Sequence, residues 1–345
     1  MTNPITDAIH AAVDRRDLTV EQMRAAVGAV MDGNASEAET AALLTALRMK
    51  GEAVDEIVGA ARAMVERCTP VRCSRSGLLD TCGTGGDALH TFNISTATAL
   101  VVAATGVPIA KHGNRSVSST SGSADVLKAL GVNIELSAEQ VGACIDELGI
   151  GFCFAPLFHG AMKHAAAVRR QLGFRTIFNL LGPLTNPAGA PFQLLGANTP
   201  NAAEKIARTL QRLGRKRAVV VCGNRELDEV ALWGETTAWI IEAGNLRTET
   251  WTPASFGLPS CAVEELVVSS ADESARVIRG VIAGEAGPAR NIVLANCAAA
   301  LFAVDETADL PTGVATAENV LDDGSAGSLL DRFVTHTRSA LPERL

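Results

Sequence analysis

The feature that most constrains the fold is a change in hydrophobic pattern near residue 78 of this 345-residue chain. Before this point, apolar residues recur only at helical spacing. After it, apolar runs of strand length alternate with helical patterns, until the chain returns to helices over 270–338. We expect strands at 78–82, 107–110, 150–154, 192–195 and 218–222, a hairpin at 236–241 and 246–251, and intervening helices at 95–104, 121–130, 137–148, 161–171 and 201–213. The alternation predicts an α/β fold with a mostly parallel mixed central sheet flanked by helices.

The first 70 residues predict a small all-helical domain. Thr19 with Gln22, and Ser36 with Glu39, have the spacing of capping boxes, and each pair opens an apolar-periodic stretch. A further helix is expected over 54–67. Because short, alanine-rich helices make a thin core, we expect this segment to pack on the rest of the chain or on a second copy. We therefore predict a domain at 1–70 that forms a homodimer, a linker near 70–77, and an α/β domain over 71–345.

Composition excludes several classes of function. The formal net charge is −8, which disfavours a dedicated nucleic-acid binder, and the chain has no tyrosine to act as a catalytic acid or base. The eight cysteines include no CxxC pair, so we expect reduced thiols in a cytoplasmic protein. The sequence shows no signal peptide and no apolar run of about 20 residues that would span a membrane, so no membrane partner is expected.

A glycine-rich string, Gly83-Thr84-Gly85-Gly86-Asp87, directly follows the first expected strand. Glycines allow backbone amides to approach an anion, and the next helix adds its N-terminal partial charge. With Ala88 the string fits a dinucleotide fingerprint, but a polar segment separates it from the helix. The second strand also leads into a lysine where that fingerprint needs an acidic residue. The string therefore favours a loop that binds an anion other than a dinucleotide, and a glycine turn without a ligand is the remaining alternative.

Two further segments are rich in hydrogen-bond donors. Asn93, Ser95 and Thr96 stand at a helix start, where the alternatives are ordinary N-caps or a phosphate cradle. The segment 111–119 carries Lys, His, Asn, Arg and hydroxyl groups after the second expected strand, and it contains no carboxylate. Since the carboxyl ends of parallel strands share one edge of a sheet, we expect these donors to gather there around a polyphosphate.

Four strings together resemble the anthranilate phosphoribosyltransferase family. They are Gly83-Thr84-Gly85-Gly86-Asp87, Thr91-Phe92-Asn93-Ile94-Ser95-Thr96, Lys111-His112-Gly113-Asn114-Arg115, and the run from Arg175 to Pro187 that reads RTIFNLLGPLTNP. The resemblance spans essentially the whole chain. It implies an enzyme of tryptophan biosynthesis that transfers phosphoribosyl from phosphoribosyl pyrophosphate to the amine of anthranilate, with Mg²⁺, and releases pyrophosphate.

The resemblance also implies site residues, and the expected donor-binding set is Gly83, Gly86, Asp87, Thr91, Asn93, Ile94, Ser95, Thr96, Lys111, His112, Gly113, Asn114, Arg115, Ser116, Val117, Ser118, Ser119 and Ser123. Anthranilate would meet Gly83, Asn114, His159 and Arg169, the last because a guanidinium pairs well with a carboxylate. Mg²⁺ would be held by Ser95, Asp228 and Glu229. No general base is assigned, because a neutral aromatic amine is already nucleophilic.

Departures from the family pattern and two rival functions accompany this assignment. Ala88, Gly160 and Ala167 differ from the residues that are common in the family, and Glu226 precedes the acidic pair where it could perturb metal binding. The rivals are a pyrimidine-nucleoside phosphorylase-like enzyme, whose loops differ from the string at 111–114, and a nucleic-acid-binding relative, which should be basic.

Overall fold

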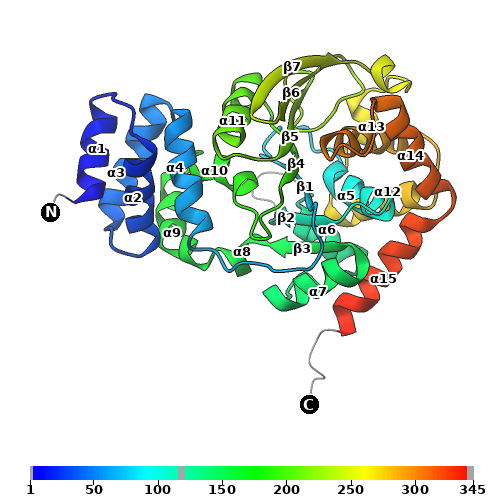
Figure 1. Ribbon diagram of the computed structural model, residues 1–345, viewed down its shortest axis with the longest axis horizontal. Coiled ribbons are helices and arrows are strands. Elements are labelled where there is room, and N and C mark those ends of the chain that lie inside the picture. Colours follow the sequence, from blue (N-terminus) through cyan, green and yellow to red (C-terminus); the bar gives the residue numbers. More distant parts are fainter. Residues whose placement is uncertain (1–2, 116–120, 340–345) are drawn as a thin grey trace.

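The computed structural model describes residues 3–115 and 121–339. Its first part is a group of four helices, as expected: α1 (Pro4–Val13), α2 (Val20–Met31), α3 (Glu37–Lys50) and α4 (Val54–Val65). Both predicted capping boxes are present, with Thr19 accepting from the Gln22 amide and Ser36 from the Glu39 amide. This group lies at one end of the molecule, and α4 faces the remainder (Figure 1).

The remainder is built on a seven-stranded sheet in the order β3-β2-β1-β4-β5-β6-β7. The strands are β1 (Leu79–Gly83), β2 (Ile109–Gly113), β3 (Ile150–Phe154), β4 (Phe192–Gly196), β5 (Arg217–Gly223), β6 (Thr236–Glu242) and β7 (Asn245–Trp251). The first five are mutually parallel, while β6 runs antiparallel to both of its neighbours, β5 and β7. The mostly parallel mixed sheet predicted from the sequence is confirmed.

Helices cover both faces of this sheet (Figure 1). They are α5 (Ile94–Ala104), α6 (Ser123–Leu130), α7 (Ala138–Leu148), α8 (Ala155–Phe158), α9 (Lys163–Leu172), α10 (Phe178–Leu181), α11 (Pro200–Arg212), α12 (Ala271–Ile282), α13 (Pro288–Ala303), α14 (Leu310–Asp322) and α15 (Ser325–Ser339). Short 3-10 turns lie at Gly160–Met162, Gly182–Leu184, Pro253–Phe256 and Val263–Leu266. No helix in the described ranges is both long and apolar enough to cross a membrane.

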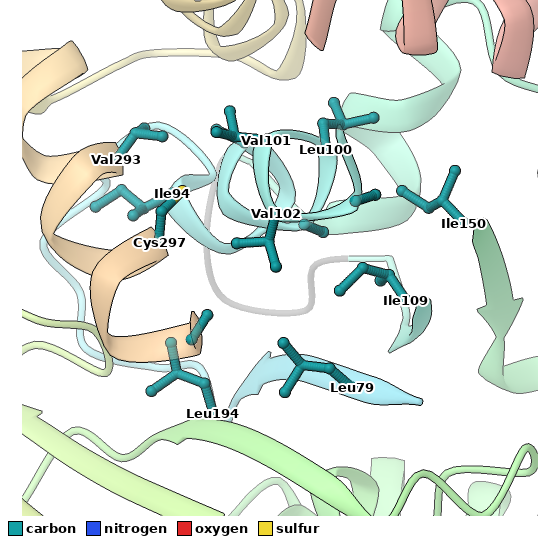
Figure 2. Close-up of a cluster of buried hydrophobic side chains, with 14 of the residues drawn as sticks. Leu79, Ile94, Leu100, Val101, Val102, Ile109, Ile150, Leu194, Val293 and Cys297 are labelled. Carbon is teal, nitrogen blue, oxygen red and sulfur yellow. The ribbon is translucent and has the colours of Figure 1, made fainter. Parts of the chain in front are cut away.

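The two faces of the sheet belong to two apolar cores. Along β5, Val219 and Val221 point into one core, whereas Ala218 and Val220 point into the other, because side chains alternate along a strand. The first core packs α5 and α13 against β1 and β4 (Figure 2). The second is shared with α1 to α4 as well as α9 and α11. The N-terminal helices therefore bury their thin core against the rest of the chain, one of the two alternatives that the sequence left open.

The second strand differs from its expected position. It was predicted at 107–110, with Lys111, His112 and Gly113 in the loop beyond it. These residues instead form the end of β2, because pairing with β3 continues as far as Gly113 opposite Phe154. Lys111 and His112 are consequently held by the sheet.

The helix predicted at 161–171 also begins differently, because a 3-10 turn at Gly160–Met162 precedes α9.

Candidate active site

The carboxyl ends of β1, β4 and β5 meet at the chain segment that carries Asp228. The Asp228 carboxylate lies against Gly83, and its backbone lies against Gly196, so that a Cβ at either glycine would collide with it. The Oδ2 atom of Asp228 accepts a hydrogen bond from the Gly85 amide at 2.6 Å. The glycine loop and the acidic pair, 143 residues apart in sequence, therefore form one structure.

The N-terminus of α5 lies beside this loop and is capped by Asn93. The Asn93 side chain accepts hydrogen bonds from the Thr96 amide at 3.0 Å and the Ser95 hydroxyl at 3.3 Å. Ile94 and Thr96 are buried, and the Thr96 amide is already bound by Asn93, so the expected contact of these two residues with the donor stays a prediction. Thr91 forms an isolated antiparallel bridge with Val267, which ties the entry to this helix to a distant segment.

Lys111 joins the end of β2 to the same place. Its ammonium is buried and donates to the Thr81 carbonyl and to the Ser95 hydroxyl, the latter at 3.2 Å. Burial lowers the pKa of Lys111, and the nearby Asp80 carboxylate opposes that shift. The structure therefore brings Ser95 and Lys111, two of the expected donor-binding residues, into direct contact.

Three carboxylates face this group of donors. Burial, with the adjacent Asp87 carboxylate, raises the pKa of Asp228 to about 7. Burial and the charge of Asp228 raise the pKa of Glu229, and Lys111 opposes the shift. Acidic groups held together in this way favour a cation. In the described ranges, no cluster of three or more histidine, cysteine or acidic residues is arranged to hold a metal by itself. This donor set fits Mg²⁺, which binds one or two carboxylates and takes its other ligands from phosphate and water.

The structure describes only some of the expected donor-binding residues that follow His112. Asn114 Oδ1 accepts from the Arg115 amide at 2.7 Å, and the Asn114 carbonyl accepts from the Ser123 hydroxyl at 3.4 Å. The Arg115 guanidinium lies 5.8 Å from the ring centre of Phe154. Ser116, Val117, Ser118 and Ser119 lie outside the described residues.

His112 and His159 form a buried pair. Their Nε2 atoms are 3.2 Å apart, and His112 Nδ1 is 2.9 Å from the carbonyl oxygen of Gly182. Because a carbonyl only accepts, His112 Nδ1 carries its proton and His112 Nε2 accepts from His159 Nε2. Burial lowers the pKa of each imidazole to about 4. Both rings are therefore neutral near pH 7.

Arg169 lies on α9, partly buried, with its guanidinium 5.4 Å from the ring centre of Phe178. Burial lowers its pKa. No carboxylate in the described part of the chain forms an ion pair with it, so an anionic ligand would complete its surroundings. Neither His159 nor Asn114 is hydrogen-bonded to Arg169, and their expected meeting around one acceptor stays a prediction.

The Glu226 carboxylate, which the sequence suggested could perturb metal binding, is hydrogen-bonded by two nearby side chains. Its Oε1 atom accepts from Asn224 Nδ2 at 2.8 Å and from Trp233 Nε1 at 3.2 Å. Asn224 and Arg225 have positive φ angles of 45° and 63°. Glu226 therefore stabilises the turn that leads from β5 to Asp228.

Sequence reasoning missed three polar residues of this region. Asp80 is fully buried in β1 and accepts from the His112 amide at 3.0 Å. The other two, Arg175 and Asn198, donate to carbonyls of the glycine loop. The string beginning at Arg175 marked that residue as part of a motif, whereas no local signal indicated Asn198.

Comparisons with known proteins agree with this arrangement. Residues 6–68 match the model described as "Glycosyl transferase family, helical bundle domain", and residues 75–327 match "Glycosyl transferase family, a/b domain". The anthranilate phosphoribosyltransferase of Moorella thermoacetica is 48% identical over 331 residues, covering 96% of this chain and 98% of that protein. The chain belongs to the anthranilate phosphoribosyltransferase family.

Solved structures of this family have the same fold. The enzyme from Thermus thermophilus superposes with a TM-score of 0.91 at 44% identity, covering 96% of this chain and 99% of its own. The anthranilate phosphoribosyltransferase of Saccharomyces cerevisiae, solved in complex with PRPP and Mg, has a TM-score of 0.90 at 26% identity and covers 97% of this chain and 98% of its own.

Proposed function

We propose that this protein transfers the phosphoribosyl group of phosphoribosyl pyrophosphate to the amine of anthranilate and releases pyrophosphate, a step of tryptophan biosynthesis. The observation that carries the proposal is the meeting of Ser95 and Lys111 with the Asp228–Glu229 pair at one edge of the sheet. Cationic donors beside metal-binding carboxylates suit a magnesium-bound pyrophosphate. The membership in the anthranilate phosphoribosyltransferase family supports anthranilate as the acceptor.

The expected chemistry relies on placement and charge. The Lys111 ammonium, the amides of the glycine loop and the N-terminus of α5 would stabilise negative charge on the leaving pyrophosphate. Ser95, Asp228 and Glu229 would hold Mg²⁺, which when bound neutralises further phosphate charge. Binding both substrates in line would supply much of the acceleration.

The acceptor would lie on the side of the site formed by α9 and the histidine pair. Arg169 would bind the anthranilate carboxylate, because its guanidinium is partly buried and has no carboxylate partner within the described ranges. His159 and Asn114 would contact the ring and amine. No side chain needs to act as general base, since the amine attacks in its neutral form and loses its proton afterwards.

We also propose the domain division and assembly expected from the sequence. The two family matches, over 6–68 and 75–327, support domains at 1–70 and 71–345.

Val13 on α1 and Met49 on α3 expose 65% and 74% of their surface, which supports a homodimer through the N-terminal helices. Light scattering should report a dimer for the wild type and monomers for the double variant Val13→Lys with Met49→Lys. A wild-type monomer would contradict this assembly.

All eight cysteines are free thiols, which supports a reducing, cytoplasmic location.

The activity is tested by following anthranilate fluorescence with phosphoribosyl pyrophosphate and Mg²⁺, with thymidine and inorganic phosphate as the control pair. We expect turnover only with the first pair. Phosphorolysis of thymidine would instead support the nucleoside phosphorylase alternative, and a salt-dependent shift of DNA mobility would support the nucleic-acid-binding one.

A further inference from the structure

The glycine loop is held by two side chains, those of Arg175 and Asn198, to which the proposed chemistry gives no role. Arg175 Nη2 donates to the carbonyl oxygens of Thr84 at 3.3 Å and Gly85 at 3.2 Å. Asn198 Nδ2 donates to the carbonyl oxygen of Gly86 at 2.6 Å. Three consecutive carbonyls are thus bound by two side chains. Arg175 follows α9 in the chain, and Asn198 follows β4.

Binding these carbonyls determines where the amides point. In a trans peptide the C=O and the N–H of the same unit point in opposite directions, and the described chain has no cis peptide. The Thr84–Gly85 unit is fixed at both ends, by Arg175 at its oxygen and by Asp228 at its nitrogen. The next two units are fixed at their oxygens alone. Their N–H groups, those of Gly86 and Asp87, therefore point away from Arg175 and Asn198.

These two amides have no acceptor within the described chain. Backbone N–H groups are strong donors that are seldom left unpaired when shielded from water, and successive free amides in a glycine turn form an anion-binding concavity. Both could serve one phosphate group.

The loop needs external support because of its backbone conformation. Gly85 and Gly86 have left-handed φ angles of 65° and 76°, and glycine moves between such conformations at little cost. A Cβ at Gly86 would also collide with the Arg175 guanidinium. The glycine that permits this close contact thus also leaves the peptide units free to rotate if the contact is lost.

We propose that Arg175 and Asn198 are positioning residues that hold the carbonyls of Gly85 and Gly86 and so aim the amides of Gly86 and Asp87 at the pyrophosphate of the donor. The nature of that anion rests on the proposed function, whereas the orientation of the loop does not. Arg175 lies three residues after α9, so it also links the helix of the expected acceptor residue Arg169 to the donor loop.

The kinetic test compares Arg175→Gln, Arg175→Lys and Asn198→Ala with the control Arg170→Gln, which alters an exposed arginine on α9. For Arg175→Gln and Asn198→Ala we expect the KM for phosphoribosyl pyrophosphate to rise about 10-fold or more, since small misplacements at a site cost up to ~10²-fold. The KM for anthranilate should stay within about twofold. Arg175→Lys should be intermediate, because one ammonium reaches fewer carbonyls than a guanidinium does. Equal rises in both KM values, or an unchanged donor KM, would overturn the proposal.

Hydrogen exchange in the substrate-free protein separates positioning from direct phosphate binding. The Gly85 amide, protected by Asp228, should exchange faster in Arg175→Gln than in the wild type, while Arg170→Gln should match the wild type. If Arg175 bound phosphate without holding the loop, exchange at Gly85 would be unchanged, and the proposal would be wrong.

Calorimetry with inorganic pyrophosphate and Mg²⁺ keeps the two proposals distinct. We expect the wild type to bind pyrophosphate and both Arg175→Gln and Asn198→Ala to bind it at least about 10-fold more weakly. If the wild type binds pyrophosphate but never consumes anthranilate, the proposed function fails and the positioning role stands. If all variants bind pyrophosphate equally, the positioning role fails whatever the activity.

Discussion

The Nε2 atoms of His112 and His159 lie 3.2 Å apart in a buried part of the fold, one on β2 and the other between two short helical turns. The Gly182 carbonyl fixes the proton of His112 on Nδ1. Protonation of either ring would place a positive charge in a buried environment, and a proton on His112 Nε2 would also remove the acceptor of the hydrogen bond between them. This pair therefore makes the folded state sensitive to acid.

Stability should fall as the pH is lowered from about 6.5 to about 4. The pKa of each histidine is about 4 in the folded protein and near 6.5 when unfolded, so the unfolded chain binds more protons in this window and gains stability relative to the native state. A shift of this size corresponds to roughly 3 kcal/mol for one imidazole.

Urea unfolding at several pH values measures this dependence. His159→Gln should flatten the acid limb, whereas His10→Gln, which alters an exposed histidine on α1, should leave the limb as in the wild type. An acid limb of equal slope in His159→Gln and the wild type would contradict the role of the pair.

Arg169→Ala should weaken anthranilate use specifically. A charge-assisted hydrogen bond to a carboxylate contributes roughly 1.5–3 kcal/mol, so the KM for anthranilate should rise on the order of 10- to 100-fold. The donor KM should change by less than about twofold, and the exposed neighbour Arg170, changed to Ala, provides the control. Steady-state kinetics with each substrate varied in turn decides the matter, and parallel rises in both KM values would remove Arg169 from the acceptor site.

The double variant Asp228→Asn with Glu229→Gln should lose magnesium dependence while its substrate-free form becomes more stable. Burial raises the pKa values of both acids, with the charge of Asp87 adding to the shift of Asp228 and the charge of Asp228 adding to that of Glu229, so neutral amides of the same shape relieve an unfavourable charge. We expect the melting temperature to rise by roughly 1–3 °C and the Mg²⁺ titration of activity to lose its saturable rise. Asp331→Asn, an exposed change on α15, is the control. An unchanged Mg²⁺ titration would exclude the pair from the metal site.

Local patterns were sufficient for most of the fold. Strands buried on both faces are short continuous apolar runs, so β3 and β5 were visible in the sequence, as were the capping boxes at Thr19 and Ser36. The end of β2 was misplaced because Lys111 and His112 are polar and look like loop residues. Their partners, Ser95 and His159, are distant in sequence and were not visible as partners.

Residues of the candidate site were predictable only where they belong to a recognisable sequence motif. Asn198 acts on a carbonyl 112 residues away, and Arg175 on carbonyls about 90 residues away. Such side-chain contacts with backbone leave no periodicity or spacing in the sequence. Glu226 shows the converse limit, because its charge beside the acidic pair suggested interference, whereas its carboxylate is engaged by Asn224 and Trp233.

The central claim is that donor and acceptor react at the carboxyl edge of this sheet, and one assay tests it most directly. Purified protein is mixed with anthranilate, phosphoribosyl pyrophosphate and Mg²⁺, while anthranilate fluorescence and released pyrophosphate are measured together. The predicted result is loss of fluorescence matched one to one by pyrophosphate, and neither change when any one component is omitted. Unchanged fluorescence with the complete mixture, or pyrophosphate release that does not require anthranilate, would contradict the account.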